Sequence, residues 1–130
     1  MKQSIYVAII AITMLTGCNG KSSAGDQSTP EGVAGMVFSA AKSGDYGSLK
    51  DLCDASLEPN KDTKMICEVP TGDDELKKRF KEYFSMGKVV GSPVIEGDKA
   101  KVSVTIGKDG TRAETFNMAK KNGKWYLVSF

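Results

Sequence analysis

The sequence predicts an α+β domain in which N-terminal helices pack on a curved antiparallel sheet. Apolar residues recur every three or four positions in residues 33–41 and 76–84, and they alternate with polar residues in residues 100–106. The helical patterns all precede the alternating ones, which favours separate helical and sheet layers. With 130 residues, 40% of them hydrophobic and 26% charged, the chain suits one small core. Its composition differs from those of disordered, collagen-like and many-pass membrane proteins.

The first seventeen residues have the features of a removable targeting segment. Lys2 adds a positive charge, and residues 5–15 form an uncharged, mostly apolar run, far shorter than the ~20 residues of a membrane-spanning helix. The run ends in Leu15-Thr16-Gly17-Cys18, which resembles the lipobox of bacterial lipoproteins. The resemblance implies cleavage before Cys18, a diacylglycerol thioether on its sulfur, and acylation of the new amine, for example with palmitate. The alternative is an ordinary secretory signal in which Cys18 is incidental.

The residue after the cysteine bears on the destination. Asn19 stands where an Asp would retain an enterobacterial lipoprotein at the inner membrane, so the analogy implies the outer membrane, facing the periplasm, in a Gram-negative host. The expected location is therefore the cell envelope, with the membrane as a partner through the lipid anchor. Two or three acyl chains hold a protein stably, because each buried methylene contributes roughly 0.8 kcal/mol.

A tether is expected to join this anchor to the domain. Residues 18–29 comprise the lipidated cysteine and a stretch rich in Gly and Ser without large apolar side chains, and the α+β domain spans residues 30–130. Thr29 as N-cap and Pro30 at the first helical position predict a helix that ends at Ser43 and Gly44. Its apolar face comprises Val33, Met36, Val37, Ala40 and Ala41.

The next segment is expected to be less regular. Asp45 is expected to cap a short second helix that places Leu49, Leu52 and Cys53 on one side. Residues 54–72 have no sustained period and contain two prolines, so they predict a long connection. If lipid occupies Cys18, Cys53 and Cys67 remain as an even pair, which in an exported protein indicates a disulfide. That bond would stabilise the fold by roughly 3 kcal/mol. A catalytic redox pair is the alternative, but it requires closer spacing.

A third helix is predicted after Thr71 or Asp73. Its apolar face comprises Leu76, Phe80, Tyr83 and Phe84. The remaining surface carries Lys77, Lys78, Arg79 and Lys81. This basic cluster would suit phosphate or anionic lipid, but a solvated face is the favoured interpretation.

After Gly87 the period becomes two. Residues 88–96 predict a strand that is interrupted at Gly91 and Pro93, and that is therefore bulged or an edge. A hairpin turn at residues 107–110 separates two further strands, at residues 100–106 and 111–119, and residues 125–130 form the last one. In the strand at 111–119, one face carries Arg112, Glu114, Phe116 and Met118.

The break at Gly44-Asp45-Tyr46 and the terminal Asn122-Gly123-Lys124-Trp125-Tyr126-Leu127-Val128 strand resemble the nuclear transport factor 2-like (cystatin-like cone) superfamily, which occurs in many small bacterial lipoproteins. The resemblance covers about residues 30–130. It implies a cone with a pocket between the helices and the sheet. In relatives that are isomerases or dehydratases, this pocket contains an Asp or Glu that acts as the catalytic base. Residues 54–70 depart from the usual pattern, which leaves the depth of any pocket open.

Catalytic chemistry is poorly supported by these residues. The chain has no histidine, which removes the commonest neutral-pH base and metal ligand. The acid-base pairing retained is Glu114 with Tyr83 or Tyr126, and the alternative for Glu114 is a cross-strand ion pair with Lys101. No cofactor, metal site or catalytic residue is predicted, and a net charge of +2 does not indicate nucleic acid.

The aromatic residues give the remaining functional signal. A candidate pocket comprises Tyr83, Phe84, Glu114, Phe116, Trp125 and Tyr126; the alternative is that the aromatic side chains pack the core. The expected function is a noncatalytic envelope lipoprotein that binds a small molecule or an envelope protein. The alternatives are an isomerase- or dehydratase-type enzyme and an envelope inhibitor or assembly module.

Overall fold

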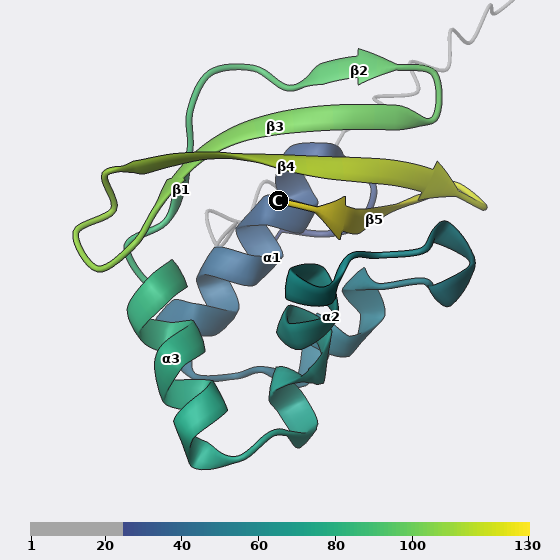
Figure 1. Ribbon diagram of the computed structural model, residues 1–130. Helices are drawn as coiled ribbons and strands as arrows, with labels where there is room; N and C mark the ends of the chain where they lie inside the picture. Colours follow the sequence, from purple (N-terminus) through teal and green to yellow (C-terminus); the bar gives the residue numbers. More distant parts are fainter. Residues whose placement is uncertain (1–24) are drawn as a thin grey trace, which may run out of the picture.

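The computed structural model describes residues 25–130, and these form helices followed by an antiparallel sheet (Figure 1). The α+β class is therefore confirmed. The signal-like segment and Cys18 lie outside the described residues. The sheet has the order β1 (Lys88–Val89), β3 (Lys99–Ile106), β4 (Arg112–Lys121), β5 (Lys124–Ser129), and β2 (Val94–Glu96) also pairs with β3 on the β1 side. Helix α1 contacts β1, β3 and β5, so it covers one face of the sheet.

Helix α1 (Pro30–Ser43) has the predicted limits. The Thr29 hydroxyl accepts a hydrogen bond from the Gly32 amide at 3.0 Å, as an N-cap does. Gly44 ends the helix with φ 78 and donates its amide to the Ala40 carbonyl, because a left-handed C-cap is accessible to glycine without strain. The buried side chains of α1 are Pro30, Val33, Ala34, Val37, Phe38, Ala40 and Ala41.

The prediction for residues 45–53 is correct in burial but wrong in type. The segment is a 3₁₀ helix, η1 (Gly47–Leu52), which buries Leu49 and Leu52. Asp45 is not its N-cap; its carboxylate accepts the Gly47 amide at 3.4 Å, which closes a local turn instead.

The prediction of a long connection over residues 54–72 is wrong. This segment contains the 3₁₀ turns η2 (Ala55–Leu57) and η3 (Val69–Thr71) and the helix α2 (Lys61–Glu68). The Asn60 side chain caps α2 by accepting the Thr63 amide at 2.9 Å. Only Thr63 and Ile66 of the helix are buried, too few to give a helical period in the sequence. A disulfide joins Cys67 of α2 to Cys53.

Helix α3 (Asp74–Phe84) is capped by Asp73, whose carboxylate accepts the Leu76 amide at 2.8 Å. Phe80 and Phe84 are buried, and Leu76 and Tyr83 are half-buried against the core. The predicted apolar face is therefore confirmed.

The strand predicted over residues 88–96 consists of two short edge pieces, β1 (Lys88–Val89) and β2 (Val94–Glu96). Both pair antiparallel with β3 (Lys99–Ile106). The interruption at Gly91 and Pro93 is the one that was predicted. Pro93 has no amide hydrogen to donate, and Gly91 has φ 72.

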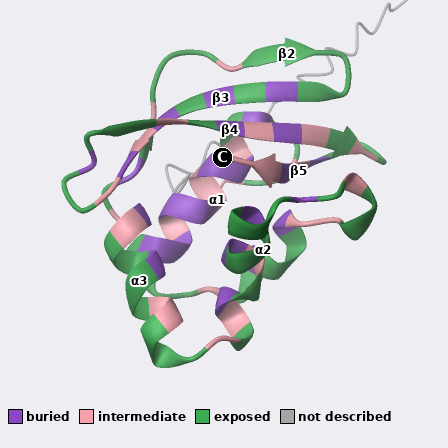
Figure 2. Ribbon diagram, in the orientation of Figure 1, coloured by how far each residue is buried: buried purple, intermediate pink, exposed green. Residues whose placement is uncertain are grey.

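Strand β3 alternates as predicted, and Ala100, Val102, Val104 and Ile106 are buried. It pairs with β4 (Arg112–Lys121), and β4 pairs with β5 (Lys124–Ser129). On β4, Phe116 and Met118 are buried on the face that α1 covers. Figure 2 shows the buried residues between α1 and the sheet, with exposed residues along β2 and the outside of α3.

Lys121 joins the η2 region to the sheet by donating hydrogen bonds to Asp54 and to the Ser56 hydroxyl. Asp54 accepts hydrogen bonds from the Ser56 hydroxyl and amide and from the Lys121 ammonium, the last at 3.0 Å. These bonds lower the pKa of Asp54 from 3.8 to about 2, and the bond from the Ser56 hydroxyl has the largest effect.

Because this pKa is lower in the folded chain than in the unfolded one, the carboxylate stabilises the fold above pH ~4, and the contribution is lost as the pH falls to about 2. We therefore expect Asp54→Asn to lower the free energy of unfolding at neutral pH, with a difference from the parent protein that shrinks on acidification. Urea unfolding at several pH values measures this. The control is Asp51→Asn, which changes an exposed side chain. A difference for Asp54→Asn that stays constant down to pH ~2 would contradict the assignment.

Candidate functional site

A cavity of about 480 Å³ lies between α2, α3 and the end of the sheet that carries the β3–β4 hairpin. Its apolar wall is contributed by α2 and η3, by α3, and by the last residue of the chain. These residues are Met65, Ile66, Val69, Leu76, Phe80, Phe84 and Phe130. Tyr83 and the charged residues Asp62, Arg79, Glu82, Lys108, Arg112 and Glu114 complete the lining.

The aromatic wall is a connected cluster of rings. The ring centroid of Phe84 lies 5.0 Å from that of Phe80, 5.0 Å from that of Tyr83 and 5.8 Å from that of Phe130. Such tilted and edge-on contacts are the arrangements that aromatic pairs prefer. Phe116 lies behind this wall, with its ring 5.5 Å from that of Phe130, and its side chain is fully buried. The cavity is therefore backed by the core.

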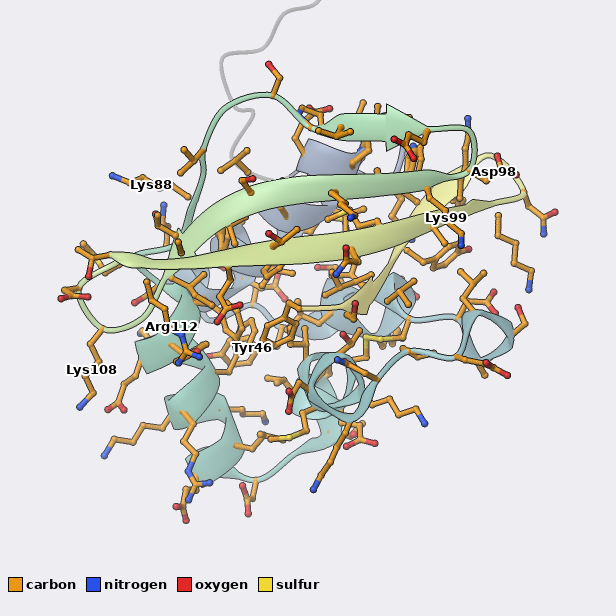
Figure 3. All side chains as sticks on the ribbon, turned by 45° about the horizontal axis from the view of Figure 1, so that its top comes forward. Tyr46, Lys88, Asp98, Lys99, Lys108 and Arg112 are labelled. Carbon is orange, nitrogen blue, oxygen red and sulfur yellow. A yellow bond between two sulfur atoms is a disulfide. The ribbon has the colours of Figure 1, made fainter. Side chains whose placement is uncertain are left out.

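The hairpin places two cations beside the aromatic wall. The Gly107 amide donates to the Tyr83 carbonyl at 2.8 Å, which fixes the hairpin to α3. Arg112 lies over the Tyr83 ring, with 5.8 Å between its guanidinium carbon and the ring centroid, a cation–π distance. Figure 3 shows Arg112 between the hairpin end of the sheet and α3, with Lys108 farther out at the turn.

The charges of the lining are partly paired. Arg112 Nε donates to Glu114 Oε1 at 3.0 Å, and Arg79 donates to Glu75 at 2.6 Å. Lys108 is exposed and makes no ion pair within residues 25–130. The ion pair of Arg112 uses Nε, so its terminal nitrogens remain able to donate to a bound molecule.

Asp109 does not belong to the site. Its carboxylate accepts hydrogen bonds from the Thr111 hydroxyl at 2.8 Å and from the Thr111 amide. The hydroxyl bond, and secondly the amide bond, lower the pKa of Asp109 below its usual range. Asp109 therefore acts within the hairpin turn that was predicted over residues 107–110.

Three of the six residues predicted to form a pocket line the cavity, namely Tyr83, Phe84 and Glu114. Phe116 supports it from the core. Trp125 lies elsewhere, buried at the other end of the sheet, where its amide donates to the Gln27 carbonyl and Lys120 lies over its ring. Tyr126 is also outside the cavity: it pairs with Ala119 on the face opposite to Trp125 and Leu127.

The geometry also decides between the roles considered for Glu114. Lys101 is exposed and pairs with Asn117 on the other face of the sheet, so the proposed cross-strand ion pair with Lys101 is not formed. Arg112, two residues away on the same strand face, is the partner. Tyr83 shares the cavity with Glu114, whereas Tyr126 does not.

Sequence reasoning missed the contribution of α2 and of the hairpin cations. Met65, Ile66 and Val69 fell in the segment that was expected to be a connection, and their spacing is too short to show a period. Phe130 was expected in the last strand and was not among the six residues of the candidate pocket. Asn60, three residues before Thr63, was the available signal, because Asn is among the preferred N-caps.

Within residues 25–130, no three His, Cys, Asp or Glu side chains are grouped so that they could hold a metal ion. The cavity lining in this part of the chain includes no Ser, Thr or Cys, the usual nucleophiles of covalent catalysis. The arrangement is suited to holding a molecule with an apolar body and a polar group near the hairpin.

No helix in the described part of the chain is both long and apolar enough to cross a bilayer. No family model, curated protein or solved structure matches the chain.

Proposed function

We propose that this chain is a lipid-anchored protein of the cell envelope whose domain, a variant of the nuclear transport factor 2-like cone, binds a small amphipathic molecule without chemically changing it. The observation that carries the proposal is the cavity of about 480 Å³ walled by aromatic and aliphatic side chains, with charged groups at the hairpin. Ligand sites commonly have about 300–1,000 Å³, mostly apolar walls and a few placed polar groups.

The lining suggests how a ligand is oriented. An apolar body would lie against Phe84, Phe130 and Ile66, where contact with water is lost on binding. A polar group would lie near Lys108 and the terminal nitrogens of Arg112. Met65 is 39% exposed at the α2 wall, and its flexible thioether can adapt to different ligand shapes.

The cone assignment rests on the position of the cavity. Helices precede an antiparallel meander, and the cavity lies between the two layers at one end of the sheet. Cone domains hold their ligands in the same relative place. The short helix α2 supplies a wall within residues 54–70, the segment for which the depth of any pocket was left open.

Glu114 and Tyr83 favour a second candidate, an isomerase- or dehydratase-type enzyme, because both line the cavity. The ion pair with Arg112 at 3.0 Å argues for binding instead, since it occupies one oxygen of the Glu114 carboxylate. A pocket acid that shuttles protons must be free to accept one in the complex.

The lipid anchor accounts for residues 1–29. Cys18 follows a lipobox-like sequence, and residues 19–29 provide a polar spacer before the first helix. The Cys53–Cys67 disulfide is consistent with export to an oxidising compartment. Anchored in this way, the cavity would sample amphipathic molecules near the envelope membrane.

The cavity is tested by Met65→Trp, which places a larger side chain at its wall. We expect binding of the neutral fluorescent probe N-phenyl-1-naphthylamine to weaken about tenfold, or about 1.4 kcal/mol. Lys64→Trp is the control, because Lys64 is exposed on the same helix and does not line the cavity. Fluorescence titration measures both. Equal probe affinities in the parent and in Met65→Trp would show that the probe binds elsewhere. A catalytic activity of the parent that is lost in Glu114→Gln would support the isomerase- or dehydratase-type enzyme instead.

The anchor is tested by Cys18→Ser expressed with its leader in a Gram-negative host. We expect the parent to fractionate with membranes and to carry the mass of its acyl chains. The variant should lack that mass, because a serine hydroxyl cannot form the thioether to diacylglycerol. A variant that stays membrane-bound, beside a parent with no added mass, would refute the lipoprotein assignment.

A further inference from the structure

The large apolar side chains that remain exposed gather on one edge of the sheet. Within residues 25–130 these are Met65, Met86, Val90, Val94 and Ile95. Met65 belongs to the cavity, whereas the other four lie along β1, β2 and the residues that flank them. We call Met86, Val90, Val94 and Ile95 the apolar edge; their exposures are 57%, 47%, 57% and 52%.

The apolar edge presents side chains from both faces of the sheet. Val94 lies opposite Lys101, on the solvent face, and Ile95 lies opposite the buried Ala100, on the face that α1 covers elsewhere. Val90 is held in line by its amide, which donates to the Ser103 carbonyl at 2.8 Å. The result is an apolar ridge, where edge strands usually carry charge or are covered.

The backbone of this edge is unsuited to pairing with another strand. β1 has two residues and β2 has three. Between them, Pro93 lacks an amide hydrogen and Gly91 has φ 72, so no continuous row of donors and acceptors faces outward. A partner that contacts side chains without backbone hydrogen bonds fits this edge better than an added strand.

Gln27, near the start of the described residues, lies at the same end of the sheet as β2. The Trp125 amide donates to the Gln27 carbonyl at 2.8 Å, Trp125 pairs with Lys120, and the Lys120 amide donates to the Asp98 carbonyl at 2.7 Å. Asp98 directly precedes β3 in the turn after β2. Figure 3 shows Asp98 and Lys99 at the end of the sheet opposite Lys108 and Arg112.

The segment from Cys18 to Gln27 is long enough to cover this distance. From β5 to β2 there are three strand spacings, about 14 Å. Nine residues of a Gly- and Ser-rich linker have an r.m.s. length of about 15–18 Å. If Cys18 is held in a bilayer, the apolar edge can therefore reach its surface.

We propose that the apolar edge rests on the phospholipid surface of the membrane that holds Cys18; this inference rests on the lipid anchor of the proposed function. The apolar side chains enter the interfacial region, and the lysines beside them, Lys88, Lys99 and Lys101, reach the headgroups. Glu96 and Asp98 offset part of that positive charge. Four side chains hold a free domain only weakly, but the tether gives them a high effective concentration at the surface.

This contact orients the cavity. The Asn60 amide, just before α2, donates to the Val128 carbonyl of β5 at 2.9 Å, so α2 lies by the sheet edge opposite to β2. Figure 1 shows β2 at the top and α2 and α3 at the bottom. With the apolar edge on the bilayer, the cavity faces away from it.

Hydrogen exchange with mass spectrometry tests the proposal on the lipidated chain in phosphatidylcholine vesicles, compared with Cys18→Ser mixed with the same vesicles. We expect peptides that cover residues 86–96 to exchange at least about threefold more slowly in the anchored chain, with α2 unchanged. Val94→Asp/Ile95→Asp should remove this protection while the lipid keeps the protein in the membrane fraction. Ala113→Asp/Thr115→Asp, on exposed positions of β4, should retain it.

The proposal is overturned if residues 86–96 exchange equally fast in the anchored chain and in Cys18→Ser. It is also overturned if they are protected without vesicles in a concentration-dependent manner, which would indicate a second copy or another protein as the partner. If the native chain carries no lipid, the anchor fails separately. The edge is then tested after coupling the Cys18 thiol to a maleimide lipid, since Cys53 and Cys67 are joined to each other.

Discussion

The bond between Cys53 and Cys67 joins η1 to α2, two elements that also pack against each other in the core. Cys53 follows η1, whose Leu49 and Leu52 lie in the core, and Cys67 is in α2, which buries only two side chains. A helix as short as α2 is not stable by itself in water. The disulfide and the hydrogen bond from Asn60 to β5 therefore keep α2 in place.

The cavity exists because α2 stays there. One wall comes from α2 and η3, the other from α3 and the hairpin, and the fully buried Phe116 supports the rings between them. The opposite sheet edge is short, interrupted and apolar. The same small domain thus separates two surfaces across the sheet: a cavity suited to an amphipathic molecule, and an edge suited to the membrane that we propose anchors it.

The sequence predicted the elements whose apolar faces are long enough to show a period. Thr29 and Asp73 cap the beginnings of α1 and α3. The glycines of the hairpin turn mark the end of the alternating strand β3. α2 was missed because it buries only Thr63 and Ile66. Of the site, Tyr83, Phe84 and Glu114 were foreseen, but which strand end forms a cavity depends on pairing register and on the bulge at Asn117 and Met118. The sequence pattern does not specify the register or the bulge, so Trp125 and Tyr126 were wrongly assigned to the pocket.

The most direct measurement compares the oxidised chain with Cys53→Ala/Cys67→Ala, following α2 amide exchange, unfolding by urea and binding of N-phenyl-1-naphthylamine. If the disulfide holds the cavity wall, the variant loses about 3 kcal/mol of stability and still folds. Its α2 amides exchange faster while those of β3 and β4 stay protected, and the probe binds more weakly. A variant whose α2 remains protected and whose probe affinity is unchanged would contradict the account.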